Sequence, residues 1–324
     1  MRTVWSRALA AAFGLLVGGA FLLFAFRGTQ PAAVWAVLAA GRWDWPAAVV
    51  LAGTVAFVLA KSARWRLLLG AASAPSVAAL ARPVTAGLAL NALLPHAGEF
   101  VRAFSLQRQH GLAASAVLSS IVAERVFDLF AVLILAAFAL AVLPVPAEVW
   151  GAVRLLALVA AGLAAVVLAA VAWPARVRAI AGSVLGPLPA ALRTLVLAQV
   201  DAALAGLAPV RSPATSVTVL AWSVLQWLAV AACVAGSAAV VGLQIGLPAA
   251  AFVVVGIVVA FLLPNAPGYA GSVQVAFLVT LRPQGVPQDA ALAASFVYQL
   301  LMVLPLVVVG LAWLRASLRR ASAP

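Results

Sequence analysis

The chain has few of the residues from which most catalytic and metal sites are built. Its 324 residues include one cysteine, Cys233, two histidines, His96 and His110, and seven acidic side chains. A single cysteine excludes an intrachain disulfide and a cysteine cluster for a metal ion. The sequence also lacks a glycine-rich phosphate loop, a His/Glu zinc helix and a Gly-x-Ser-x-Gly elbow. We therefore expect neither a cofactor nor a metal.

Charged residues of any kind are scarce, at 8%, whereas 67% of the residues are hydrophobic and the mean hydropathy is +1.19. A soluble core cannot bury that much apolar surface, so the composition predicts an all-α polytopic membrane protein. The formal net charge of +13 comes from basic residues at the ends of apolar runs. This placement is typical of topology signals and lipid contacts. The expected partners are membrane lipids, and no nucleic acid.

Six long, mainly apolar segments predict full membrane crossings. They lie at 8–26, 46–63, 112–143, 149–172, 215–241 and 287–313. The first run is longer than the apolar part of a cleaved signal peptide, so we expect a retained helix. A tryptophan-rich piece at 31–45 is expected at the membrane interface. The long connection, 174–213, contains an apolar pattern at 188–207 that predicts a helix on the membrane surface.

Two further apolar segments, 76–95 and 245–281, are interrupted by proline. The first contains Arg82, Pro83 and Pro95, and the second contains Pro264-Asn-Ala-Pro-Gly268. Broken backbone at membrane depth is tolerated where protein or a wet cavity shields it, so we interpret both as re-entrant hairpins. The alternative is that both cross fully, which gives about eight spans. The polar link 98–110 is expected to be helical.

Basic residues set the predicted orientation. With six crossings and two re-entrant hairpins, fourteen Lys and Arg residues fall at inner loops and ends, and four fall at outer ones. Such an excess favours a cytoplasmic N-terminus and a cytoplasmic C-terminus.

The two interrupted segments also resemble each other. Leu93-Leu94-Pro95 matches Leu262-Leu263-Pro264, and in the spans that follow Glu124 falls on Tyr298 and Arg125 on Gln299. We interpret this as an inverted repeat within one membrane domain, 1–324. The approximate halves are 46–143 and 215–313, joined by 149–214. Interrupted segments at corresponding positions of inverted repeats point to a transporter's substrate site. The alternative is a chance match between low-complexity segments.

Three of the seven acidic residues, Glu99, Glu124 and Asp128, lie close together in the sequence. Ser120, Glu124 and Asp128 are spaced by four and share one helix face, and Arg125 can reach Asp128 at i,i+3. Glu124 lies roughly 18 Å from the helix start, well inside the hydrocarbon, where an unpaired charge costs on the order of 2.5–3.5 kcal/mol. Two interpretations remain: an ion-pair network that locks helices, or a polar lining for a translocated headgroup or a proton-coupled switch.

Charged residues also follow the first break. Glu99 and Arg102, at i,i+3 after Pro95, suit either an anion at a helix N-terminus or an interfacial salt bridge. His96 has a side chain that titrates in the cytoplasmic range, or it is an incidental loop residue.

A basic cluster ends the second predicted crossing. Lys61, Arg64 and Arg66 surround Trp65. They are expected to extend to the interface and either to attract anionic lipids or only to stop the helix and set topology.

Four motifs together resemble the lysylphosphatidylglycerol synthase transmembrane-region family of flippase-like membrane proteins. These motifs are Asn91-Ala-Leu-Leu-Pro95, Gly98-Glu-Phe-Val-Arg102, Ala123-Glu-Arg-Val-Phe-Asp128 and Pro267-Gly-Tyr-Ala-Gly271. The resemblance implies a bacterial or archaeal multi-pass protein of the lipid-translocase type, located in the plasma (inner) membrane. The chain ends eleven residues after Trp313, so the aminoacyl-transfer domain of the full-length synthases, and lipid aminoacylation, are not expected.

The sequence departs from the family pattern in its second half. Family members often have Glu and Arg where this chain has Gln274 and Gln299, so the second half of the site is expected to be neutral.

The leading hypothesis is a translocase that moves a lipid through a wet groove between the two hairpins. We expect a polar, anionic headgroup, on a phospholipid or a polyprenyl-linked lipid. The residues expected to bind or line its path are Arg64, Arg66, Asn91, His96, Glu99, Arg102, Ser120, Glu124, Arg125, Asp128, Asn265, Gln274 and Gln299. The expected hinge residues are Pro95, Gly98, Pro264, Pro267, Gly268 and Gly271.

Two alternatives come from other functional classes. One is a non-transporting scaffold that holds an envelope-lipid enzyme, and the other is a small intramembrane enzyme that modifies a lipid.

Overall fold

The computed structural model describes residues 16–70, 74–94, 96–143, 147–187, 189–262 and 266–321. Within these ranges the regular structure is entirely helical, and five helical stretches are long and apolar enough to cross a membrane. They are α3 Trp45–Leu68, α6 Ala114–Val142, α7 Ala147–Ala172, α10 Pro213–Val240 and the continuous run Gln288–Ser317. The prediction of an all-α polytopic membrane protein is confirmed, and these stretches correspond to five of the six predicted crossings.

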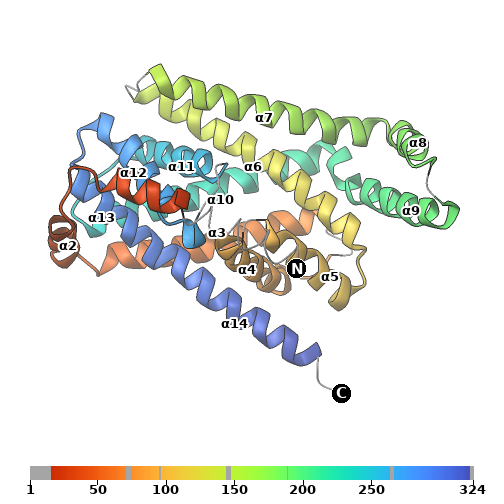
Figure 1. Ribbon diagram of the computed structural model, residues 1–324, viewed down its shortest axis with the longest axis horizontal. Coiled ribbons are helices and arrows are strands. Elements are labelled where there is room, and N and C mark those ends of the chain that lie inside the picture. Colours follow the sequence, from red (N-terminus) through yellow and green to blue (C-terminus); the bar gives the residue numbers. More distant parts are fainter. Residues whose placement is uncertain are drawn as a thin grey trace.

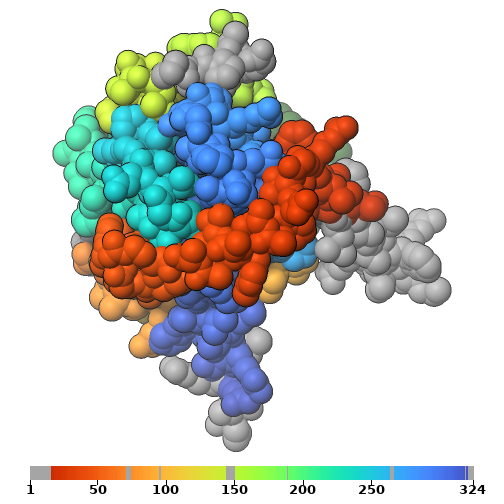
Figure 2. Space-filling view, turned by 90° about the vertical axis from the view of Figure 1, so that its left-hand side faces the viewer, coloured from red at the N-terminus to blue at the C-terminus, as the bar shows by residue number. Residues whose placement is uncertain are grey.

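The first predicted crossing, 8–26, lies partly outside the described residues. Its described part is the apolar helix Leu16–Ala25. After it, α2 Pro31–Ala39 packs on the last span, with Val34 buried against Leu292 and Ala293. Figure 2 shows this N-terminal stretch, in red, lying across one end of the molecule beside the blue helices near the C-terminus.

The first interrupted segment, 76–95, is one continuous helix with Pro83 inside it, so the prediction of a hairpin within 76–95 is wrong. The chain reverses only after this helix, and the polar link 98–110 is helical, as predicted, and supplies the second helix. The result is two hairpins of two short helices each. The first consists of α4 Val77–Leu93 and α5 Ala97–His110; the second consists of α11 Leu247–Phe261, the turn η2 Pro267–Tyr269 and α12 Ser272–Leu281. In each, the two helices pack on each other, and η2 touches α4. In Figure 1, α4 lies near the middle with α5 to its right, and α11 and α12 lie toward the left. Their re-entrant position in a membrane and the inverted repeat stay predictions.

Small residues let α4 and α5 approach closely. A Cβ atom added at Gly98 would collide with the backbone carbonyl oxygen of Gly87. The chain reverses just before α5, where His96 has a left-handed backbone with φ of 63°, a conformation that is uncommon outside glycine and asparagine. The second break uses Gly268 and Gly271, with φ of 72° and 85°. Both glycines therefore lie at the second break, and their role as hinges stays a prediction. Pro95, Pro264 and Asn265 lie outside the described residues.

The last span changes its helical form midway. It consists of α13 Gln288–Tyr298, the π-helical turn η4 Gln299–Val303 and α14 Leu304–Ala321. Pro305 is the second residue after η4, and proline has no N–H to donate along the helix, which favours a local departure from α-helical bonding.

The long connection between α7 and α10 is helical. It contains α8 Pro174–Val184, α9 Ala190–Gly206 and the short turn η1 Ala208–Arg211. The helix expected over 188–207 is therefore present, and it packs against the first half of α6, where Gly206 lies against Ala116. Its position on a membrane surface stays a prediction.

The apolar core is divided where the polar residues lie. On α3, Phe57 belongs to one buried cluster and Trp65 to another, with Lys61 between them in sequence. On α10, Val219 and Val230 belong to the same two clusters. On each helix, the stretch between the residues of one apolar cluster and those of the other carries the polar side chains of the candidate site.

Candidate functional site

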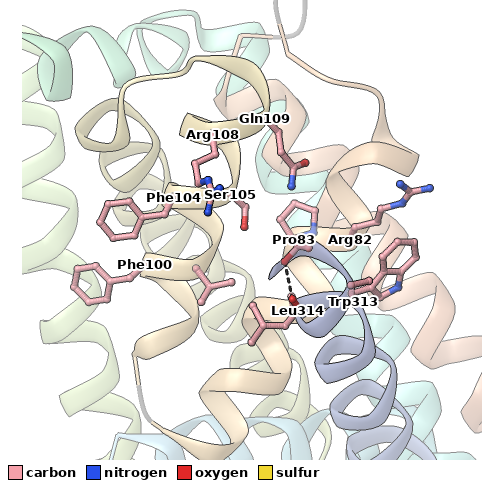
Figure 3. A pocket seen from close by; sticks show the side chains of 13 residues that line it. Arg82, Pro83, Phe100, Phe104, Ser105, Arg108, Gln109, Trp313 and Leu314 are labelled. Atoms are coloured by element: carbon pink, nitrogen blue, oxygen red, sulfur yellow. Dashed lines mark hydrogen bonds between the residues drawn. The ribbon is translucent and has the colours of Figure 1, made fainter. Parts of the chain in front are cut away.

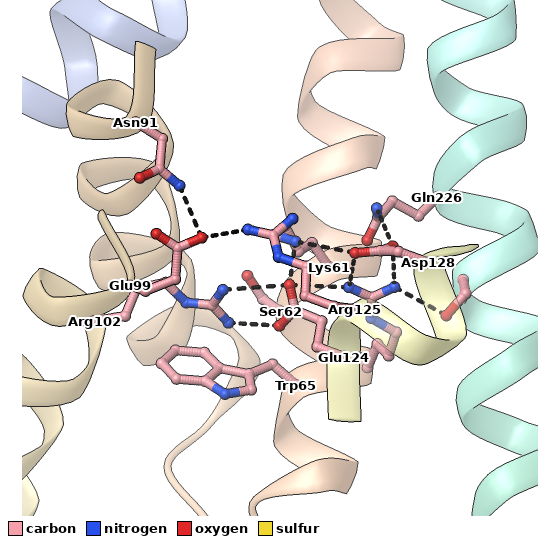
Figure 4. Close-up of polar contacts among 12 residues, drawn as sticks. Lys61, Ser62, Trp65, Asn91, Glu99, Arg102, Glu124, Arg125, Asp128 and Gln226 are labelled. Carbon is pink, nitrogen blue, oxygen red and sulfur yellow. Dashed lines mark hydrogen bonds and ion pairs between the residues drawn. The ribbon is translucent and has the colours of Figure 1, made fainter. Parts of the chain in front are cut away.

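The carboxylate of Glu124 on α6 is the centre of a buried ion network (Figure 4). Glu124 is fully buried and is held by three cations. Arg102 of α5 donates two hydrogen bonds, of 3.2 Å to Oε1 and 2.7 Å to Oε2. From α3, the Lys61 amine bonds Oε1, and Arg64 Nη2 lies 3.0 Å from the same oxygen. One carboxylate therefore joins α3, α5 and α6.

Asp128, one helical turn further along α6, forms the second centre. Arg64 donates to both of its oxygens, at 2.5 Å and 3.2 Å. The helix α10 adds two donors to Asp128 Oδ1, with Gln226 Nε2 at 3.2 Å and Trp227 Nε1 at 3.0 Å. Ser223 of α10 accepts a 2.9 Å bond from Arg64 Nη1. Asp128 therefore connects α10 to the network.

A third carboxylate, Glu99 of α5, pairs with Arg125 of α6 and is the member closest to solvent. The side chain of Arg125 is 45% exposed and that of Glu99 is 13% exposed. Asn91 of α4 spans the break, because its amide donates to Glu99 at 3.3 Å while its oxygen accepts from the Gly98 N–H at 2.7 Å. The first hairpin is thus fastened to α6 by one buried and one partly exposed ion pair.

Aromatic contacts position the buried arginine of α5. The guanidinium carbon of Arg102 lies 3.9 Å from the ring centroid of Trp65, within the range of a cation–π contact. The indole N–H of Trp65 donates to Ser120 Oγ at 3.1 Å. Ser120, Glu124 and Asp128 are all buried, which confirms the polar stripe predicted for this helix.

The second hairpin contains a neutral counterpart. Gln274 of α12 donates a 2.6 Å hydrogen bond to Gln299 in the last span. Gln274 Oε1 accepts from the Gly271 N–H at 2.8 Å, and Gln299 Nε2 donates to the Gly268 carbonyl at 3.0 Å. Each hairpin is therefore fastened to its following span by side-chain pairs, through two ion pairs in the first hairpin and an amide-to-amide pair in the second.

The energetics of the buried members depend on pairing. Each ion loses several kcal/mol of hydration on burial, and attraction in a low dielectric compensates only when geometry and extra hydrogen bonds are good. Glu124 and Asp128 satisfy this condition through their arginine partners. Removing one partner from such a pair typically costs about 3–5 kcal/mol, because a buried charge is left uncompensated.

Two sequence interpretations of the basic residues need correction. Lys61 and Arg64 do not extend to the interface, because α3 continues to Leu68 and both side chains are buried against α6. Arg102 is likewise inside the helix bundle rather than in an inner loop. With these three residues removed, the count of inner loop and end charges falls from fourteen to eleven, still against four outer ones.

The local pairs expected along single helices are replaced by pairs between helices. Glu99 and Arg102 each bond a residue of α6, and Arg125 bonds Glu99. Cross-helix pairing is favoured because the carboxylates and the cations of both helices face the same interior. A pair at i,i+3 within one helix would leave the charged groups of the other helix without a partner. Arg66 is partly buried on α3, and His96 is exposed at the start of α5.

Several members of the network were not in the predicted site. Lys61 was expected to attract anionic lipids or to set topology, and Trp65 was noted only as the residue that the basic cluster surrounds. Ser223, Gln226 and Trp227 of α10 were not considered, although polar side chains at i, i+3 and i+4 on an apolar span share one face. That spacing was the available signal. Among the described residues, no group of three His, Cys, Asp or Glu side chains is arranged to hold a metal ion.

Comparisons with known proteins identify the family. Residues 11–310 match the family model described as the lysylphosphatidylglycerol synthase TM region. No curated protein and no solved structure matches the chain. Because the family match covers nearly the whole chain and the described residues form a helical membrane fold, the chain belongs to the lysylphosphatidylglycerol synthase transmembrane-region family.

Proposed function

We propose that the chain is a lipid translocase that moves a polar, anionic headgroup between the leaflets of a bacterial plasma membrane. The headgroup passes between the two hairpins while the tails stay in the bilayer. The family is named for a lipid-handling membrane region, which supports lipid interaction in general. The observation that carries the translocation proposal is the ion network at the first hairpin.

The network carries more positive than negative charge. It contains four cations, Lys61, Arg64, Arg102 and Arg125, and three carboxylates, Glu99, Glu124 and Asp128. A purely structural lock gains nothing from this imbalance, because a cation without its own carboxylate adds a desolvation cost and no pairing energy. An excess positive charge is useful where an anion must enter. The imbalance supports a phosphate-bearing headgroup as substrate.

The partly exposed Glu99 and Arg125 pair is the member that water and a headgroup reach first. A phosphate can replace Glu99 on the guanidinium of Arg125, because both present oxygen pairs to the same planar fork. Loss of that pair releases α5 from α6 at its solvent side, while the Arg102 and Glu124 pair still holds the buried side. In the second half we propose that the Gln274 and Gln299 pair exchanges its mutual hydrogen bond for bonds to the headgroup, without the cost of a buried charge.

The experiment is leaflet exchange in vesicles. The purified full chain is reconstituted with a trace of fluorescent phosphatidylglycerol, and a membrane-impermeant quencher reports the fraction that changes leaflet. We expect exchange above protein-free vesicles, and a reduction of about tenfold in Arg125→Gln. The matched control is Arg178→Gln, which removes an arginine from the exposed pair with Asp201 outside the network, and we expect it to behave as the unmodified protein.

Two results would reject the proposal. One is exchange no faster than in protein-free vesicles, which would favour the scaffold. The other is equal exchange by Arg125→Gln, Arg178→Gln and the unmodified chain. A chemically altered lipid recovered from the vesicles would instead favour the intramembrane enzyme.

A further inference from the structure

A groove separate from the ion network lies between the first hairpin and the last span. It has a volume of about 570 Å³, and its walls come from α4, α5 and α14. Figure 3 shows Arg108 and Ser105 on the α5 wall, and Arg82 beside Trp313 on the opposite side. Neither arginine belongs to the ion network, so the translocation proposal does not explain them.

The two arginines of the groove differ from those of the network in their partners. Arg82 and Arg108 are exposed. Within the described part of the chain, neither forms an ion pair with Asp or Glu, whereas Arg64, Arg102 and Arg125 all do. Arg82 is instead held over the indole of Trp313, with 4.4 Å from its guanidinium carbon to the ring centroid. This contact fixes the side chain while leaving its hydrogen-bond donors available.

The groove also has an apolar edge. Phe100 and Phe104 line it and are 54% and 55% exposed. They are four residues apart and stand on one face of α5, next to Ser105 and Arg108. A charged end beside exposed aromatic rings is suited to a molecule with both an anionic and an apolar part. A volume of about 570 Å³ falls in the range of small-molecule sites and suits a headgroup and glycerol rather than whole acyl chains.

We propose that this groove binds one anionic diacyl phospholipid. Its phosphate lies between Arg82 and Arg108, its glycerol region reaches Ser105 and Gln109, and its acyl chains leave over Phe100 and Phe104. The complementary charges select the anionic lipid, and the phenyl rings select a lipid over free phosphate. This binding requires no leaflet exchange, so the proposal stands independently of translocation.

Native mass spectrometry of the full chain in detergent, titrated with dioleoylphosphatidylglycerol, tests the proposal. Dioleoylphosphatidylcholine is the neutral-headgroup comparison. We expect tighter retention of phosphatidylglycerol, and weaker binding by about tenfold or more in the Arg82→Gln, Arg108→Gln double variant, since each arginine near a membrane contributes on the order of 1 kcal/mol. The control Arg178→Gln, Arg193→Gln removes the same charge from exposed positions of α8 and α9 and should retain the lipid.

Three results would overturn the proposal. They are equal affinity for the two lipids, equal affinity of the double variant and the unmodified chain, or displacement of the lipid by millimolar inorganic phosphate. If the double variant does not fold, Arg108→Gln alone decides, because Arg108 is exposed on α5. Lipid retention is measured without vesicles, so failure here leaves the leaflet-exchange result unaffected, and the reverse also holds.

Discussion

Arg125 of α6 bonds Glu99 of α5, and Gln299 of the last span bonds Gln274 of α12. The sequence comparison of the two interrupted segments aligns Arg125 with Gln299. In each case the pair fastens the second helix of a hairpin to the span that follows it. The two pairs are thus equivalent in position and differ in charge.

The double variant Glu99→Gln, Arg125→Gln should replace the ion pair of the first hairpin with a pair of amides, as in the Gln274 and Gln299 pair of the second hairpin. We expect the protein to fold with stability within about 1 kcal/mol of the unmodified chain, because a partly exposed ion pair contributes little. Leaflet exchange of an anionic lipid should fall strongly, since the accessible cation is gone. Thermal unfolding in detergent and the vesicle assay check the two parts. Unchanged exchange would show that the charge of this pair is not used.

Glu124→Gln should destabilise the protein much more. It leaves Arg102, Lys61 and Arg64 without their shared buried carboxylate, a change that typically costs about 3–5 kcal/mol. The midpoint of thermal unfolding in detergent should fall clearly. Asp201→Asn, in an exposed ion pair, is the control and should cost no more than about 1 kcal/mol. Similar midpoints for the two variants would contradict the central position of Glu124.

Trp227→Phe tests the contribution of α10. The variant removes the indole N–H that donates to Asp128 at 3.0 Å and keeps most of the ring. A hydrogen bond to a charged group is worth about 1.5–3 kcal/mol, so a measurable loss of stability is expected. The same substitution at Trp222, which is partly buried on α10, controls for the change of ring. Equal losses at both positions would assign the effect to packing.

Gly98→Ala should disrupt the first hairpin. The new Cβ would collide with the carbonyl of Gly87 on α4, and overpacking of this kind costs about 1–3 kcal/mol. Gly162→Ala is the matched control, because a Cβ at that position of α7 meets nothing within 4 Å. Alanine there should be neutral or stabilising by up to about 1 kcal/mol. Thermal unfolding of both variants in detergent provides the comparison, and an unaffected Gly98→Ala would contradict the close approach.

The predicted topology is checked by labelling single cysteines in a Cys233→Ala background. The variants Ala40→Cys and Gln284→Cys should react with an impermeant thiol reagent added outside intact cells. The variant Ser183→Cys should react only after the cells are opened. Labelling of Ala40 and Gln284 from the cytoplasmic side alone would reject the orientation with both termini inside.

Much of the fold could be predicted because hydrophobic runs determine where helices form. The runs 112–143 and 215–241 became α6 and α10 with small changes at their ends. Proline was a weaker signal, because Pro83 lies inside the continuous helix α4 although proline removes a helical donor. The polar stripe on α6 followed from the spacing of Ser120, Glu124 and Asp128.

The pairing of the charges could not be predicted from the sequence. Lys61 and Arg64 stand at the end of an apolar run, as topology signals do, and only the approach of α6 makes them buried partners of Glu124 and Asp128. Local spacing likewise suggested pairs within α5 and within α6. Which helices face one another depends on tertiary packing, and that information is spread over the whole chain.

The π-helical turn at Gln299–Val303 gives the last span two different faces. An extra residue within one turn advances every later side chain by about 100° around the helix axis. The half before the turn packs on α2, α10 and α12, and the half after it packs on α4. Gln299 stands at the start of this turn and Trp313 lies beyond it. The angular offset at η4 therefore sets the direction in which Trp313 points from the helix axis. As a result, one span contributes Gln299 to the amide pair and Trp313 to the arginine groove on different sides of the helix.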